Sequence, residues 1–386
     1  MAQSYVPEGT MIVCNAAKKP MDNTIISNRK PATVLNKEKS AILLNNTDFK
    51  LEAAFVCNFN SKFWGGLKML GAIVAIGALA ILTVATGGTI LFALAAAVAV
   101  TAAATSAYSA VREIVHDCDA TLTSKWIGFH GSVKFNKKNA LLQSSTMICV
   151  KGGALAIVVD PVLARAAMEK IAANNTEEYY THLNSQIIQG GMFVLSSNGD
   201  PRALAFGYPL TVYNYVVGED KKNDERAREI EGRITGEIKP KETGVFGTVW
   251  GALPDGEGTF TAGRDAAIGV MTEASYSPEM ITAMANNANI IKAYPAIVTA
   301  SLGSQFPMAS LRLNSSLYFA AARQTFNPGV IKSLGSGLAW GVAGAVVDGA
   351  SDQYENSIYN DTIKYFRLLI EKNIESKGIN IIANKS

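Results

Sequence analysis

Forty-three consecutive residues, 69–111, carry no charged side chain, and this run constrains the fold more than any other feature of the sequence. It contains most of two apolar stretches, residues 67–85 and 89–111, which flank a Thr-Gly-Gly segment. Stretches of 19 and 23 residues are each long enough to cross a hydrocarbon core of about 30 Å as helices. Because glycine favours tight reversals, the sequence predicts a hydrophobic helical hairpin within residues 61–117.

The residues around this hairpin are typical of a membrane interface. Trp64 and Tyr108 lie near its outer ends, where interfacial aromatic side chains occur, and Lys62, Lys68 and Arg112 supply flanking charges. Both ends of the hairpin are then expected on one side of a bilayer. A buried helix pair in a soluble protein stays open as the alternative, because the second stretch is rich in Ala and Thr.

The segments on either side of the hairpin differ in character. Residues 1–60 and 118–160 are turn-rich and predict short strands, whereas Asp160 and Pro161 form an N-cap followed by proline at the first helical position. We therefore place a domain boundary at 160/161 and predict a mainly helical mixed domain at 161–386. Within it we expect helices starting at 176 and 277, helices at 308–324 and 352–373, and strands at 192–195 and 204–217. The predicted fold class is α+β.

The charge balance and the N-terminal residues limit the function. The chain has 35 basic and 32 acidic side chains, a formal charge of +3, and this balance argues against a nucleic-acid binder. Residues 1–15 lack a basic segment followed by an apolar one, so we expect no Sec-type signal peptide. We expect the protein in the cytoplasm of the producing cell until another machine exports it.

Four short motifs occur in order along the chain, each containing one cysteine. They lie at residues 9–14 (Gly-Thr-Met-Ile-Val-Cys), 54–57 (Ala-Phe-Val-Cys), 116–118 (His-Asp-Cys) and 126–153, which ends in Cys-Val-Lys-Gly-Gly. This pattern resembles the PAAR-like family of bacterial spike-tip proteins. The resemblance covers residues 1–60 and 118–160, leaves out the hairpin, and does not reach 161–386. The chain departs from the family at Asn15, at Val150 and in lacking a proline beside Cys118.

The resemblance implies a small β-rich cone that caps the trimeric VgrG-type spike of a type VI secretion system. It implies that the chain carries its C-terminal domain into the target-cell envelope as an antibacterial effector, with a cognate immunity protein. The hairpin would enter the target membrane, and either a chaperone or the chain's own C-terminal domain would cover it before firing. If residues 1–60 and 118–160 form the complete docking module, removing 161–386 should leave spike binding intact.

The cysteines are Cys14, Cys57, Cys118 and Cys149, and no two of them have the close spacing of a zinc knuckle. The resemblance implies that they converge in the folded cone, where a Cys₄ zinc site would cross-link a module with little core. His116 is an alternative ligand. Disulfides formed after export and plain core packing both stay open.

No catalytic constellation stands out. The chain has no Gly-x-Ser-x-Gly elbow, and residues 161–386 contain no cysteine and a single histidine, His182, within a predicted amphipathic helix. We therefore assign no catalytic residue. Two alternatives to an envelope-directed effector stay open, an enzymatic toxin with an unrecognised active site and a purely structural tip.

Overall fold

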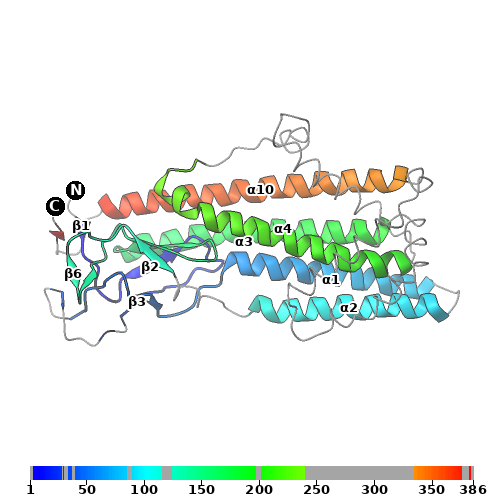
Figure 1. The fold of residues 1–386 in the computed structure, drawn as a ribbon, viewed down its shortest axis with the longest axis horizontal. Coiled ribbons are helices and arrows are strands. Elements are labelled where there is room, and N and C mark those ends of the chain that lie inside the picture. The colour runs from blue at the N-terminus through cyan, green and yellow to red at the C-terminus, as the bar shows by residue number, and fades with distance from the viewer. Residues whose placement is uncertain are drawn as a thin grey trace.

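Five long helices run side by side, and a small β region covers one end of the bundle they form (Figure 1). The computed structural model describes residues 3–27, 29, 34–36, 40–84, 89–114, 124–196, 201–239, 334–375 and 382–383. The combination of long helices with small antiparallel sheets confirms the α+β fold class.

The main sheet joins segments from both sides of the hairpin. Its order is β2-β9-β8-β5, with antiparallel pairing throughout, formed by β2 (Met11–Cys14), β9 (Ala154–Val158), β8 (Thr146–Ile148) and β5 (Lys125–Ile127). Cys14 pairs with Leu155 across the β2–β9 ladder. A strand from before the hairpin, β2, and a strand from after it, β9, are therefore direct neighbours, and the hairpin is an insertion between strands of one sheet.

Three two-stranded sheets complete the β region. They pair β1 (Gln3–Ser4) with β10 (Ile382–Ala383), β3 (Ile25–Ile26) with β4 (Lys50–Leu51), and β6 (Lys134–Phe135) with β7 (Lys138–Asn139). The β1–β10 pair brings segments near the two ends of the chain together beside the sheet (Figure 1).

The predicted hairpin consists of α1 (Asn58–Val84) and α2 (Thr89–Ile114). Small residues let the two helices approach closely: a Cβ built on Gly71 would lie 2.8 Å from the carbonyl oxygen of Ala102. Glycine at this position therefore permits the observed spacing. The predicted reversal at Gly87 and Gly88 lies outside the described residues.

Three further helices pack against the hairpin and the sheet: α3 (Pro161–Ser196), α4 (Pro201–Thr235) and α10 (Leu334–Glu375). The predicted start of α3 is confirmed, because the Asp160 carboxylate accepts a hydrogen bond of 2.8 Å from the backbone N–H of Val162.

Several element predictions for this region were wrong. The strands expected at 192–195 and 204–217 are helical, and the helix expected to start at 176 is the middle of α3. The helix expected at 352–373 is confirmed, although it begins earlier, at Leu334. Short runs of β-branched and aromatic residues do not distinguish a buried helix from a strand, and here lateral packing of long helices decides. The helices expected at 277 and 308–324 lie outside the described residues.

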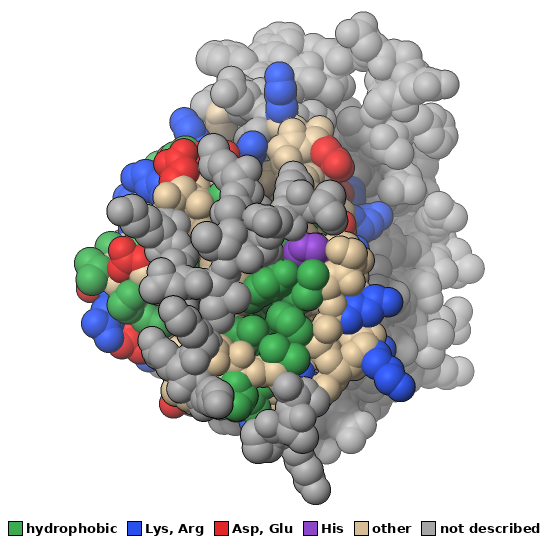
Figure 2. Space-filling model, turned by 90° about the vertical axis from the view of Figure 1, so that its left-hand side faces the viewer, with side chains coloured by type: hydrophobic (Ala, Val, Ile, Leu, Met, Phe, Trp, Pro, Cys, Tyr) green, Lys and Arg blue, Asp and Glu red, His purple; other side chains and the backbone are tan. Residues whose placement is uncertain are grey.

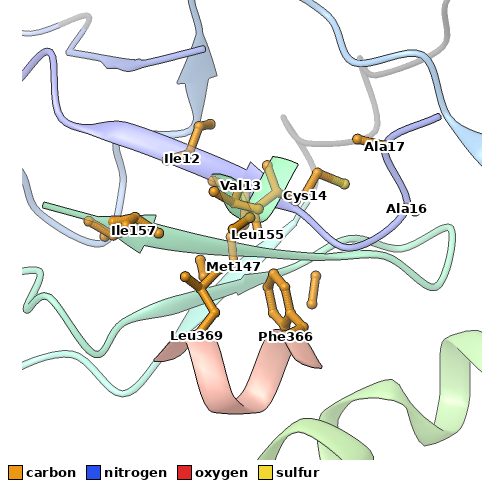
Figure 3. Close-up of a cluster of buried hydrophobic side chains, with 14 of the residues drawn as sticks. Ile12, Val13, Cys14, Ala16, Ala17, Met147, Leu155, Ile157, Phe366 and Leu369 are labelled. Carbon is orange, nitrogen blue, oxygen red and sulfur yellow. The ribbon is translucent and has the colours of Figure 1, made fainter. Parts of the chain in front are cut away.

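The sheet and the C-terminal helices share one hydrophobic core. Figure 3 shows Phe366 and Leu369 of α10 directed toward Met147, Leu155 and neighbouring side chains of the sheet. Ala164, Ala167 and Met168 of α3 belong to the same cluster of buried residues. The boundary at 160/161 therefore marks a change from strand to helix within one core.

A second cluster holds the hairpin. It joins α1 and α2 with α3 and α4 through Leu70, Ala102, Phe193 and Tyr208, all buried. The hairpin is thus covered in part by the helices that follow it in the chain.

Candidate functional site

Lys62 of α1 lies in the middle of the bundle, with a side chain only 4% exposed. Its ammonium nitrogen is 2.8 Å from a carboxylate oxygen of Glu178 on α3 and 2.5 Å from one of Glu355 on α10. Two carboxylates from two different helices therefore pair with Lys62 at the base of the hairpin.

The carboxylate of Glu178 has further partners. Its Oε1 accepts a hydrogen bond of 3.0 Å from Arg226 of α4, and its Oε2 accepts one of 2.7 Å from the Asn58 amide of α1. The Arg226 guanidinium also lies over the ring of Tyr359, 4.2 Å from its centroid. Four helices thus contribute to the buried ion-pair network of Lys62, Glu178, Arg226 and Glu355.

His182 of α3 extends this network. Its Nδ1 lies 3.1 Å from the Glu355 carboxylate and its Nε2 lies 3.0 Å from the Tyr215 hydroxyl of α4. Because the Tyr215 hydroxyl donates to the carbonyl oxygen of Phe63, its oxygen is available to accept from the ring. Both ring nitrogens of His182 therefore lie within hydrogen-bond distance of a polar partner.

The electrostatics of the network favour ionised carboxylates. Burial alone would raise the pKa of Glu355, but Lys62 and His182 outweigh that effect and hold its pKa well below the ordinary value of 4.5. Burial would likewise raise the pKa of Glu219 on α4, but the electrostatic effects of His182, Lys222 and Lys62 outweigh it and lower that pKa. Glu355 and Glu219 therefore stay charged at neutral pH, and they pair with Lys62 and Lys222, respectively.

This geometry suits a structural role, in which the ion pairs fix the position of α1 relative to α3, α4 and α10. Glu178 is fully buried, and the carboxylates of Glu178 and Glu355 are occupied by cations of the network. A general acid or base needs a free face toward a substrate, and the described residues offer none here. His182, the one histidine available for catalysis in 161–386, is held within the bundle.

Sequence analysis did not identify this network. Lys62 was interpreted as a membrane-flanking charge, and Glu178 and Glu355 were not singled out. One signal was available: Glu355 lies three residues before Ile358 and therefore falls on the apolar stripe of its helix, where an acidic residue needs a partner.

The structure places three of the four predicted zinc ligands around one core. Cys14 ends β2, Cys57 immediately precedes α1 and Cys149 follows β8, and all three belong to or pack against the same hydrophobic cluster. Cys118 and His116 lie outside the described residues.

The donor set has the right chemistry for zinc, but the described residues hold no group of three ligands close enough for a metal ion. Burial raises the pKa of the Cys57 thiol, which favours its neutral form in the absence of a cation. Zinc therefore stays a prediction.

The β end of the molecule presents an apolar patch (Figure 2). A small cluster lies in this region, in which Tyr5 and Val133 pack against buried Phe135, and the Tyr5 ring contacts the His130 ring at a centroid distance of 6.0 Å. Lysine and arginine side chains lie at the rim of the patch. An apolar centre with a polar rim is typical of a protein interface.

One helical segment of the described residues, Asn58–Ile81, has the length and hydropathy of a membrane span. Less than half of its most apolar stretch is buried by the rest of the chain. The core helix of a soluble protein would be mostly buried. Packing against the rest of the chain therefore accounts for only part of the apolar surface of α1.

Residues 83–161 match a family described as Domain of unknown function (DUF4280). The match ends at the position predicted for the module boundary. It includes α2, which the expected module left out, and it does not extend to residues 1–60. Neither the curated proteins nor the solved structures contain a match to this chain.

Proposed function

We propose that this chain is a spike-tip protein that caps a VgrG-type trimer and carries its own helical region, as an antibacterial effector, to the envelope of a target cell. The observation that carries the proposal is the closure of β2 onto β9. It joins the first motif, before the hairpin, and the fourth motif, after it, in one sheet, as an insertion into a single tip module requires.

The apolar patch at the β end is the proposed docking surface for the spike. It lies at the opposite end of the molecule from the last residues of α1 and the first residues of α2, so a docked tip points its helices away from the spike. A trimeric spike with one tip on its threefold axis takes a single copy of the chain.

The hairpin's cover before firing is proposed to be the chain's own C-terminal helices. A Cβ built on Gly77 of α1 would lie 2.5 Å from Val194 of α3, and one built on Gly190 of α3 would lie 3.1 Å from Ile73 of α1. These tight contacts and the buried Lys62 bind α1 to α3, which supports this choice over a separate chaperone.

Co-purification tests the docking step. The full chain is expected to co-purify with a VgrG-type trimer at one copy per trimer. Val133→Asp, which places a charge in the patch cluster, should abolish co-purification. Val150→Asp is the matched control because Val150 is an exposed valine, 57% accessible, at the β8–β9 turn outside that cluster. Equal binding by both variants would move the docking surface elsewhere.

Competition between cells tests the membrane step. Ala80 is exposed on α1, so Ala80→Lys should leave the fold and spike docking intact. A charge in the middle of a bilayer costs about 3 kcal/mol, so killing of sensitive cells should fall. Undiminished killing by this variant would show that α1 acts only as a packed helix.

A further inference from the structure

In the described helices, long segments without charged side chains lie in one half of the bundle. Beyond the buried ion-pair network, on the side away from the sheet, each helix contributes a segment without Asp, Glu, Lys or Arg: 69–84 of α1, 89–111 of α2, 179–196 of α3, 203–218 of α4 and 334–347 of α10. We call these segments the uncharged half.

The five segments lie side by side. Lys62 contacts both Glu178 and Glu355, so α1, α3 and α10 enter the uncharged half at one level. A Cβ built on Gly71 of α1 would collide with the carbonyl oxygen of Ala102, so α1 and α2 are in close contact. The Tyr215 hydroxyl of α4 donates a hydrogen bond to the carbonyl oxygen of Phe63 on α1, so α4 also lies beside α1. The hairpin thus shares its uncharged character with three helices that sequence analysis assigned to a separate domain.

Apolar side chains cover part of the outside of this half. Ile76 of α1 is 63% exposed, Val100 of α2 61%, and Ile188 and Leu195 of α3 47% and 62%. A helix of a water-soluble bundle places such residues inside. Large apolar side chains on three neighbouring helices indicate a surface made for an apolar environment.

The interior of the same half contains uncharged polar groups. Thr101, Thr105 and Ser109 on α2 are buried, as are Ser185 and Gln186 on α3. Among the described residues, no hydrogen-bond partner is found for Ser109 Oγ or Gln186 Oε1. On α3, Gln186 is buried while the next two residues, both isoleucine, are exposed, which inverts the usual order of a soluble helix.

Aromatic side chains mark the boundary of the uncharged half. The rings of Trp64 on α1 and Tyr108 on α2 contact each other at 5.7 Å between centroids, and Arg112 lies over the Trp64 ring. Tyr180, 58% exposed, follows Glu178 on α3 at the same level. Tyrosine and tryptophan beside a charge boundary are typical of the interface between membrane and water.

The size of the uncharged half agrees with a bilayer. At 1.5 Å per residue, the 16-residue segment of α1 is about 24 Å long and the 23-residue segment of α2 about 35 Å long. These lengths bracket the hydrocarbon thickness of about 30 Å.

We propose that the uncharged half enters the target-cell bilayer as one unit, with α3, α4 and α10 accompanying the hairpin. Its exposed apolar side chains face the acyl chains, its buried polar groups stay inside the bundle, and the aromatic boundary lies at the headgroups. The inference rests on the proposed function and replaces a hairpin that enters the membrane alone.

Flotation of the full chain with sealed vesicles of phosphatidylethanolamine and phosphatidylglycerol tests this proposal. The parent chain should float with the vesicles. Ile188→Lys and Leu195→Lys on α3 should weaken partitioning about a hundredfold, as should Ile76→Lys on α1, because each puts a charge into hydrocarbon. Val162→Lys is the matched control, since Val162 is an exposed valine, 72% accessible, on the same helix but outside the uncharged half.

The outcomes separate the two proposals. If Ile76→Lys stops flotation while both α3 variants float like the parent, the hairpin enters alone and the inference is wrong, although the proposed function stands. If the parent itself stays with the soluble fraction, no part of the bundle enters lipid and the inference is overturned. Spike docking, measured by co-purification, is independent of either result.

Discussion

A buried lysine is costly unless carboxylates neutralise it, and Lys62 meets two of them within the bundle. Such a network adds little net stability compared with apolar packing, but removing a single partner leaves an uncompensated charge. Its main effect is on register: sliding α1 by one residue along its neighbours would separate Lys62 from Glu178 and Glu355. The hairpin is therefore fixed in position by specific residues as well as by hydrophobic contact.

The lowered pKa of Glu355 predicts how stability depends on pH. The unfolded chain binds a proton at Glu355 near pH 4.5, whereas the folded chain resists protonation until lower pH. Its contribution to the free energy of unfolding is therefore complete above about pH 4.5 and is lost as the pH falls through the folded pKa. Glu219 acts in the same direction.

Glu355→Gln should remove part of this dependence. The variant is expected to be less stable at neutral pH by about 3 kcal/mol, because Lys62 loses one of its two carboxylates. It should lose less stability than the parent between neutral pH and about pH 4. Urea unfolding at both pH values measures this, and parallel acid losses in the two proteins would exclude Glu355 as a source.

The cysteines carry a separate prediction. Protein purified under reducing conditions should contain about one zinc ion per chain, as a closed structural site does. Cys14→Ser, which removes a thiol beside the main sheet, should lower the zinc content and the melting temperature together. Metal-free protein with all four thiols open to titration would exclude the site.

At the scale of elements, α10 connects the two ends of the bundle. Its beginning lies in the uncharged half, and its end is fastened to the β region. The Asn373 amide donates to the carbonyl oxygens of Gln143 and Ile157 and accepts a hydrogen bond from the backbone N–H of Val159. Phe366, fully buried, fills the space beneath the sheet (Figure 3).

Removing α10 should therefore unfold the tip module. A chain that stops at 333 exposes the sheet core, and loss of a side chain such as Phe366 alone costs about 3–5 kcal/mol out of a total stability of about 5–15 kcal/mol. We expect insoluble protein and no spike binding, contrary to the expectation that residues 161–386 are dispensable. A chain that stops after Glu375 is the control, because it loses only the β1–β10 pair among the described elements. Soluble, spike-binding protein without α10 would show that the β region folds independently.

The sequence predicted those elements that local signals define. The hairpin follows from its uncharged length, and the start of α3 from Asp160 and Pro161. Contacts between distant residues leave no such signal: the Lys62–Glu355 pair joins positions 293 residues apart, and no local pattern links them. The core that the main sheet shares with α10 was also not predicted. The apolar stripe of 352–373 predicts that one face of this helix is buried, but it does not indicate that a sheet buries it.

At the scale of the whole molecule, the β end and the uncharged half form opposite ends of one elongated body (Figure 1). If the β end sits on the spike, the uncharged half is the leading surface and meets the target membrane first. The buried ion-pair network lies between the β end and the uncharged half. A force directed along the bundle would therefore pass through the paired charges of this network.

The pairing of β1 with β10 has a consequence for cargo attachment. Gln3 and Ala383 are neighbours in one ladder at the β end of the molecule, which is the trailing side if the β end sits on the spike. A polypeptide fused before Gln3 or after Ala383 would emerge near the spike and would have to pass along the outside of the tip to reach the front. A cargo that may enter the target cell after the tip can be fused to either chain end. A cargo that must reach the target cell before the rest of the tip would have to be inserted between helices at the far end of the bundle.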